Sequence, residues 1–330
     1  MLPAASLTAA GPASRGQLRV DPAGGRHATL EALAVVMGST AFALTPDARS
    51  LRMLGQDRRH HALDPWLREG LARLGIGRDA IPTFRRRGQR FDFCLEDSWT
   101  GWFLAPTLAS LARDESLVLL HLDGHTDLMP TLLVRKGPET AFDPATGHAF
   151  DPRLPKDWEL AIGSGAVTIG SWLTALIAVT EGRLPTIHIR HLRPAGEMMF
   201  PEVYMLQAGT VRYPLLPGYA FVAASGGGPS RGTCRTGTDA TWSLTDLPAG
   251  PIVVHVDLDY FVNDFNGNAG TAPTVPDRAA VLGRMDRFFA ALWATRRPVR
   301  QWVVAASPGF CCARHWPWLL AALAARIGSA

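Results

Sequence analysis

Residues 117 to 130 read Leu-Val-Leu-Leu-His-Leu-Asp-Gly-His-Thr-Asp-Leu-Met-Pro, and this stretch decides the fold that the sequence predicts. It begins as an apolar run, typical of a buried strand, and ends with Asp123, His125 and Asp127 at alternate positions. Because alternate side chains of an extended chain point to the same side, we expect these three to reach one point. Two carboxylates and an imidazole gathered there favour a divalent cation. A polar turn that caps a helix would explain one such Asp, but not three alternating ligands.

A second stretch has the same design. Residues 251 to 260 read Pro-Ile-Val-Val-His-Val-Asp-Leu-Asp-Tyr, an apolar run that ends in Asp257 and Asp259. Two buried parallel strands that both finish in carboxylates can place five ligands around a shared centre. Four of the five are anionic, which suits a pair of divalent ions, and oxygen with imidazole favours Mn over Zn. Water activated by two such ions is the one catalytic group that the sequence predicts.

The two motifs resemble the signatures of the ureohydrolases, the arginase superfamily. Asp-Gly-His-Thr-Asp is similar to their Asp-Ala-His-x-Asp motif, and Val-Asp-Leu-Asp to their later Asp-x-Asp motif. The wording His-Leu-Asp-Gly-His-Thr-Asp-Leu-Met and Val-Asp-Leu-Asp-Tyr-Phe is closest to the branch that includes the peptide arginases of ribosomal-peptide biosynthesis. The resemblance covers roughly residues 90 to 315.

This resemblance implies a three-layer α/β/α sandwich with a mostly parallel, arginase/deacetylase-like sheet. It implies two Mn²⁺ ions and the conversion of a peptidyl arginine to ornithine and urea. Asp123 and Asp257 would bridge the ions, His125 and Asp259 would complete one of them, and Asp127 would complete the other. The implied partner is an arginine-containing precursor peptide.

One position departs from the family pattern. After the expected strand Arg90–Leu95 the chain reads Glu96-Asp97-Ser98-Trp99, and Ser98 stands where the family has a histidine that binds the first ion. The sequence leaves three outcomes open: Glu96 or Asp97 holds this ion instead, the ion binds weakly, or it is absent. A histidine at position 98 is accordingly expected to raise Mn affinity. Both acids are equally well explained as caps of a helix that starts at Ser98.

Substrate contacts are less clearly marked. Met129 and Pro130 follow the first motif where free-arginine enzymes have a polar residue for the substrate carboxylate, which favours a peptide substrate. Free-arginine enzymes also have a guanidinium-binding Glu near their last strand, and no acid stands there in this chain. Glu96, Asp97 and Asp264 are candidate substrate-binding residues, although a turn explains Asp264 as well. His121 and His255, two residues before their ligand Asp, are either partners that orient a carboxylate or hydrogen-bonded core histidines.

The chain divides into an N-terminal extension of uncertain structure, residues 1–88, and a metal-dependent domain, residues 89–330. Residues 1 to about 28, rich in Ala, Gly, Pro and Ser, are expected to form a loose arm. Residues 29 to 44 fit a helix or a pair of strands. The remaining expected elements are helices 64–74, 98–111, 277–295 and 316–326 and strands 186–189 and 301–306.

Composition bounds the function further. Apolar residues make up 47% of the 330 residues and the net charge is only +4, without a dense basic stripe, so we expect no nucleic-acid partner. The apolar runs are too short to cross a membrane. Four cysteines without regular spacing and no secretion signal predict a reducing cytoplasm. A homo-oligomer is possible in principle and the sequence does not decide it.

Three other functions stay open. The chain could be another ureohydrolase that acts on a small guanidino compound, as agmatinases do. A deacetylase-like enzyme is disfavoured, since the paired histidines and single zinc of that group are not found. A non-catalytic peptide-binding relative would follow if the loss of the histidine at position 98 abolished metal binding.

Overall fold

The computed structural model describes residues 6–9, 17–21, 26–135, 141–178, 185–194, 202–213, 216–223, 232–238, 240, 244–266, 273 and 275–328. The helices are α1 (Arg26–Met37), α2 (Leu67–Arg73), α3 (Trp99–Ala109), α4 (Pro155–Ser164), α5 (Trp172–Ala178), α7 (Arg278–Ala294) and α8 (Trp316–Ile327), with short 3₁₀ turns η1 (Arg59–Leu63), η2 (Arg78–Thr83) and η3 (Leu258–Tyr260). The strands are β1 (Ser6–Ala9), β2 (Gln17–Asp21), β3 (Thr40–Leu44), β4 (Ser50–Gln56), β5 (Arg85–Arg86), β6 (Asp92–Cys94), β7 (Ser116–Leu122), β8 (Val134–Arg135), β9 (Ala141–Phe142), β10 (Ala149–Phe150), β11 (Thr186–Leu192), β12 (Glu202–Tyr213), β13 (Leu216–Ala223), β14 (Gly232–Gly237), β15 (Ile252–Asp257) and β16 (Val299–Ala305).

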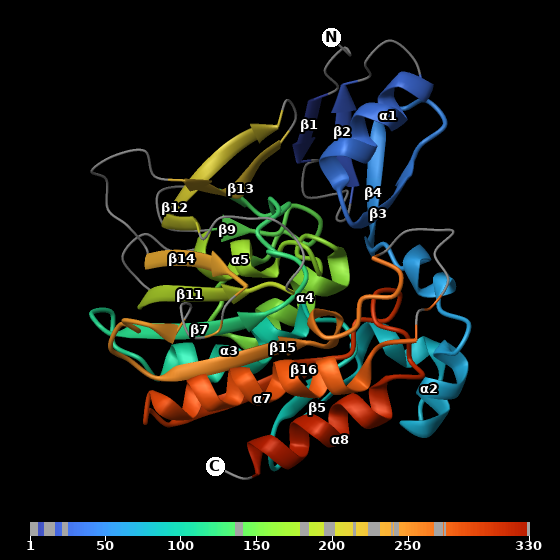
Figure 1. Ribbon diagram of the computed structural model, residues 1–330. Helices are drawn as coiled ribbons and strands as arrows, with labels where there is room; N and C mark the ends of the chain where they lie inside the picture. The colour runs from blue at the N-terminus through green and yellow to red at the C-terminus, as the bar shows by residue number, and fades with distance from the viewer. Residues whose placement is uncertain are drawn as a thin grey trace.

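A large mixed sheet forms the centre of the molecule (Figure 1). Its middle strands run parallel in the order β14-β11-β7-β15-β16-β6. Antiparallel strands flank them, with β5 beyond β6 and with β12 and β13 beyond β14. The fold is therefore α/β with a mostly parallel central sheet, as the two apolar runs predict.

Helices cover both faces of this sheet, because β7 is apolar on both sides. Leu117 and Leu119 belong to a core cluster with α3, α4 and α5. Val118 and Leu120 belong to a second cluster with α7 and α8, on the other face. Burial on both faces explains the continuous apolar run of β7, and the arrangement is consistent with a three-layer sandwich (Figure 1).

A smaller sheet precedes the large one. The described residues between Ser6 and Gln56, here called the N-terminal module, form four antiparallel strands in the order β1-β2-β4-β3, together with α1. The expectation of a loose arm was wrong for the described residues up to 28, because β1 pairs with β2 and α1 begins at Arg26. Residues 29 to 44 contain most of α1 and the whole of β3, so one helix and one strand occur there.

Residues 57 to 88 connect the N-terminal module to the large sheet. Their apolar side chains, such as Leu67, Leu71 and Ile81, belong to the same core cluster as α7 and α8. The expected helix from Asp64 begins three residues later, at Leu67, because Asp64 accepts a hydrogen bond from the Trp66 backbone N at 2.9 Å in the preceding turn. The domain boundary at residue 88 stays a prediction.

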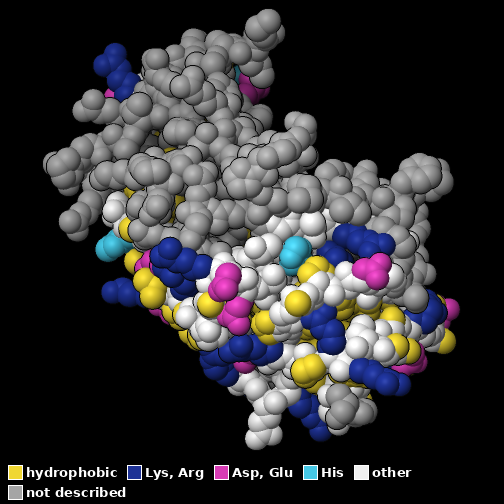
Figure 2. Space-filling view, turned by 90° about the vertical axis from the view of Figure 1, so that its left-hand side faces the viewer, with side chains coloured by type: hydrophobic (Ala, Val, Ile, Leu, Met, Phe, Trp, Pro, Cys, Tyr) yellow, Lys and Arg dark blue, Asp and Glu magenta, His cyan; other side chains and the backbone are white. Residues whose placement is uncertain are grey.

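The surface is mixed in character. On the face shown in Figure 2, the Lys and Arg side chains of the described residues are interspersed with acidic, hydrophobic and neutral atoms. Among the described helices, none combines the length and the apolar character that a membrane span needs.

Candidate metal centre

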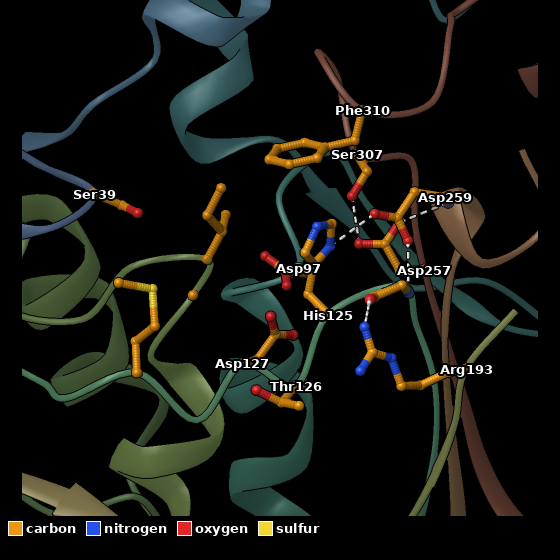
Figure 3. A pocket seen from close by; sticks show the side chains of 14 residues that line it. Ser39, Asp97, His125, Thr126, Asp127, Arg193, Asp257, Asp259, Ser307 and Phe310 are labelled. Carbon is orange, nitrogen blue, oxygen red and sulfur yellow. Dashed lines mark hydrogen bonds and ion pairs between the residues drawn. The ribbon is translucent and has the colours of Figure 1, made fainter. Parts of the chain in front are cut away.

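Three parallel strands deliver acidic side chains to one edge of the large sheet. Asp123 directly follows β7, Asp257 is the last residue of the neighbouring β15, and Asp97 lies just beyond β6, before α3. Because the carboxyl ends of parallel strands meet at the same edge, these side chains converge there. Figure 3 shows Asp97, His125, Asp127, Asp257 and Asp259 at this edge. The members of the resulting cluster are Asp97, Asp123, His125, Asp127, Asp257 and Asp259.

The potential ligand atoms form three groups among the described residues, and all three include Asp123. The groups are Asp123 with His125 and Asp259, Asp123 with Asp97 and Asp127, and Asp123 with His121 and His255, and within each group the ligand atoms lie within 4.8 Å of one another. A distance of this size between ligand atoms leaves room for a cation between them. The arrangement can therefore hold a divalent cation beside the Asp123 carboxylate.

The environment of the carboxylate oxygens supports this conclusion. Among the described residues, no hydrogen-bond donor satisfies Asp97 Oδ1 or Asp123 Oδ2, although both atoms are buried. A buried carboxylate oxygen without a partner is costly, because it loses its hydration without compensation. A divalent cation would supply what these atoms lack, so the residues present fit a metal ion.

Electrostatics point the same way. Burial raises the pKa of Asp97 well above the ordinary aspartate range, and the nearby carboxylates of Asp127 and Asp257 raise it further. Burial, Asp127 and Asp259 do the same to the pKa of Asp123. Without a cation, such closely spaced carboxyl groups retain protons to limit their repulsion. A bound cation reverses this preference and keeps them ionised.

The His125 side chain, unlike these carboxyl groups, is shifted towards its charged form. Burial opposes its charged form, but Asp259 and the neighbouring carboxylates outweigh burial and raise the His125 pKa to about 10. Its Nδ1 atom lies 3.0 Å from Asp259 Oδ2, on the side of the cluster where a cation would sit. Its Nε2 atom lies 3.0 Å from Asn266 Oδ1, which fixes the ring when Nε2 carries the proton. This tautomer leaves Nδ1 as a neutral metal ligand.

Other groups hold the carboxylates in place. Trp172 Nε1 donates to Asp127 Oδ2 at 2.8 Å, and the backbone N of Gly124 donates to Asp259 Oδ1 at 3.1 Å. The Ser307 hydroxyl donates to Asp257 Oδ2, and the Asp259 backbone N donates to Asp257 Oδ1 at 3.0 Å. Such partners orient metal ligands and tune their affinity.

Two of these residues have left-handed backbone conformations. Asp127 has φ 52° and Ser307 has φ 48°, which is uncommon for residues other than glycine. Backbone strain of this kind costs of order 1–3 kcal/mol for a residue and concentrates at functional sites. Asp127 supplies one of the carboxylates of the cluster, and Ser307 supplies the hydroxyl that donates to Asp257.

A row of three histidines lies beneath the cluster. His191, His121 and His255 occupy the same register on β11, β7 and β15, and all three are buried. Burial lowers the pKa of His191 and of His255 to about 3, so both are neutral at neutral pH. His121 Nδ1 and His255 Nδ1 are 2.9 Å apart, a hydrogen-bond distance.

The row explains the two histidines that the sequence analysis could not decide. His121 Nε2 lies 3.5 Å from Asp127 Oδ2 and 3.6 Å from Asp123 Oδ2, so it adjoins the ligands. His255 contacts His121 instead, as a hydrogen-bonded core histidine. His121 and His255 can also be grouped with Asp123 as metal ligands. We interpret them as a pair joined through their Nδ1 atoms, while the Nε2 atom of each ring is buried without a hydrogen-bond partner among the described residues.

The candidates next to Ser98 separate in the structure. Asp97 joins the cluster, whereas Glu96 points away and pairs with Arg58, whose Nη2 lies 3.0 Å from Glu96 Oε2. Ser98 is fully buried and does not line the cavity. Of the outcomes left open for the first ion, the geometry favours Asp97 as its ligand.

Asp264 also lies outside the cavity lining. Its Oδ2 accepts a hydrogen bond from the Cys312 backbone N at 3.1 Å and lies 3.4 Å from His315 Nε2. It holds the segment between β16 and α8. Its candidate substrate-binding role has no support in this geometry.

A cavity of about 360 Å³ opens over the cluster. Ser39 lies on the side opposite the acids, and Arg193 and Phe310 line the flanks (Figure 3). Met129 and Ile169 also line the cavity. Sequence reasoning singled out Met129, but it missed Ser39, Ile169, Arg193 and Phe310 and the supporting Trp172, His191 and Asn266.

The sequence does mark some residues of the site. Ser307 directly follows the predicted strand 301–306, which ends at the same sheet edge. His191 and Arg193 were missed because the predicted strand ended at Ile189, whereas β11 continues to Leu192. Because Arg190 and His191 are polar, the apolar pattern that predicted the strand stops before them. Trp172 and Ser39 carried no signal, because only tertiary packing brings them to the site.

Comparisons with known proteins do not assign this arrangement to a family. The sequence matches no protein-family model, and a search of curated proteins gives no significant match. What the site does must therefore be argued from its own residues.

Proposed function

We propose that the protein is a manganese-dependent hydrolase with an arginase/deacetylase-like fold, which converts arginine side chains of a peptide to ornithine and urea. Two of the three ligand groups carry the proposal: Asp123 with His125 and Asp259, and Asp123 with Asp97 and Asp127, at the carboxyl edge of a parallel sheet. The motif resemblance supplies the reaction class and the peptide substrate. The oxygen-rich ligand set, with a single imidazole, favours Mn²⁺ over Zn²⁺.

Two divalent cations bound here would supply Lewis-acid activation of water for attack on the guanidinium carbon. The reaction balances as guanidinium plus water giving an alkylammonium and urea. A carbon–oxygen bond forms, the bond from that carbon to the side-chain nitrogen breaks, and this nitrogen takes up both protons of the water. The leaving nitrogen therefore needs protons delivered within the cavity.

The net charge of the metal-loaded cluster favours a cationic substrate. Asp97, Asp123, Asp127, Asp257 and Asp259 contribute five negative charges when ionised, and two divalent cations contribute four positive ones. The cluster then carries −5 + 4 = −1, which attracts a guanidinium. Trp172, Ser307 and Asn266 keep the ligands in fixed positions, so that little reorganisation is needed when the substrate binds.

The test uses an arginine-containing heptapeptide incubated with the protein and Mn²⁺. Conversion of arginine to ornithine removes about 42 Da from the peptide by formula arithmetic, and a coupled assay measures the urea. Asp257→Ala should abolish the reaction, and Leu54→Ala, at an exposed position on β4, should not. Urea formation that is unchanged in Asp257→Ala would refute the assignment.

A second candidate is hydrolysis of a small guanidino acid. Arg193 favours it, because this cation lines the cavity and its Nη2 lies 3.5 Å from the Gly124 carbonyl oxygen, next to the cluster. A guanidinium there can bind a free carboxylate. If this candidate is correct, 4-guanidinobutyrate turns over and the amidated peptide does not. Agmatine, which has no carboxylate, then serves as the control substrate.

The precursor peptide and the compartment belong to the same proposal. All four cysteines are buried and free of disulfides, which fits a reducing environment such as the cytoplasm. A non-catalytic peptide-binding relative would bind arginine peptides without forming urea.

A further inference from the structure

We infer that residues 57–63, together with the α1–β3 turn of the N-terminal module, form one wall of a groove that binds the peptide segment flanking the reacting arginine, in extended form and through a surface of balanced charge. The inference rests on the proposed function, because it assigns the rest of the substrate of that site. It gives residues 57–63 and this turn a role in substrate selection.

The groove is a second cavity, of about 550 Å³, that adjoins the metal cavity. The two share the lining residues Ser39, Ile169 and Phe310, so one opens into the other. We call the part beyond these shared residues, lined by Asp57, Arg59, His60, Leu63 and Asn266, the side groove. A single arginine side chain would occupy the metal cavity and leave the side groove for its neighbours, since pockets of roughly 300–1,000 Å³ accommodate a ligand of several residues' size.

The N-terminal module is fixed at this position by polar contacts. Thr40 Oγ1 donates to the Gly165 carbonyl oxygen at 2.6 Å, and Gln56 Oε1 accepts from the Ile169 backbone N at 3.1 Å. These bonds hold the α1–β3 turn beside the metal cavity, where Ser39 faces the acidic cluster from the far side (Figure 3). The wall is therefore preorganised.

The charge of the side groove indicates what it binds. Its charged side chains, Asp57 and Arg59, pair with each other at 2.6 Å. Burial lowers the pKa of His60 to about 4, so this ring is neutral at neutral pH. A groove with balanced charge does not select acidic or basic neighbours. It fits a peptide main chain with neutral side chains.

The side groove also touches the metal centre. Asn266, which lines it, contacts His125 Nε2, and the Phe310 ring packs against both the His125 and His60 rings, with centroids 5.1 and 5.3 Å apart. A peptide seated there therefore lies directly beside a ligand of the proposed ions. This places its reactive arginine at the entrance to the metal cavity.

The test compares two substrates, N-acetyl-arginine amide and a heptapeptide with arginine at its centre and neutral flanks. Leu63→Trp should fill the side groove and lower kcat/KM for the heptapeptide about tenfold relative to that for the short amide, the loss expected for about 1.4 kcal/mol of flanking contacts. Leu54→Trp is the matched control, because Leu54 is half-exposed on β4 and lies outside the groove lining. It should leave the ratio unchanged.

Two further measurements keep the result interpretable. Fluorescence anisotropy of the labelled heptapeptide reports binding without turnover. Hydrogen exchange of the wild-type protein should show protection of residues 57–63 when the peptide is added, whether or not Leu63→Trp folds.

The outcomes separate the two proposals. If no urea forms but the wild type binds the heptapeptide and Leu63→Trp loses it, the hydrolase proposal fails and the groove assignment stands. If urea forms and Leu63→Trp keeps the wild-type ratio, or residues 57–63 gain no protection, the groove assignment is wrong.

Discussion

The replacement Asp97→Asn tests the part of the site that the motif resemblance did not supply. Asp97 belongs to one of the three ligand groups, whereas Asp123 belongs to all of them. The amide keeps the shape of the side chain but removes a charge and an anionic ligand. We therefore expect the loss of one ion and the retention of the other.

The magnitude follows from the geometry. The ion among Asp97, Asp123 and Asp127 would keep two of these three carboxylates. Because loss of a mere supporting partner typically costs 10–100-fold in metal affinity, loss of a direct ligand should cost at least about 100-fold, or about 2.8 kcal/mol. The ion beside His125 should change far less.

The assay is calorimetric titration with Mn²⁺, with metal content measured after dialysis. The wild type should hold close to two ions and Asp97→Asn close to one. Glu96→Gln is the matched control: the neighbouring acid, paired with Arg58 outside the cavity, should affect stability but not stoichiometry. Two ions of unchanged affinity in Asp97→Asn would refute the reasoning.

The remaining predictions concern the surroundings of the cluster. Trp172→Phe removes the hydrogen bond to Asp127 and should weaken Mn²⁺ binding about 10–100-fold in the same titration, with unchanged affinity as the contrary result. Ser98→His should not raise Mn affinity as the family pattern suggested, but should lower the unfolding free energy by about 1–3 kcal/mol in urea titrations, since Ser98 is fully buried and a larger side chain overpacks the site. Without metal, the melting temperature should fall as pH rises above about 4, because the unfolded aspartates ionise there while folded Asp97, Asp123 and Asp257 keep their protons. Excess Mn²⁺ should reverse this trend between pH 5 and 8, since the ions bind the deprotonated carboxylates; a melting temperature insensitive to Mn²⁺ would contradict it.

The sequence predicted the parts of this site that depend on local sequence patterns. Alternation after an apolar run placed Asp123, His125 and Asp127, and a repeat of that pattern placed Asp257 and Asp259. Both motifs end parallel strands, so one sheet edge collects them. The α/β class and the mostly parallel sheet followed from the same apolar runs.

Other parts depend on tertiary packing, which a single sequence does not display. Whether Glu96 or Asp97 enters the site depends on how the chain turns between β6 and α3, and the decisive partner, Arg58, is 38 residues earlier. Trp172 reaches Asp127 across 45 residues. Residues 1 to about 28 were taken for a loose arm, because the short strands β1 and β2 carry weak alternation and are stabilised only by their pairing within the sheet.

Anomalous diffraction from crystals soaked in Mn²⁺ tests the central claim most directly. The account predicts two peaks, one among Asp123, His125 and Asp259 and one among Asp97, Asp123 and Asp127. A cluster with no peak, or with its only peak between His121 and His255, would contradict it.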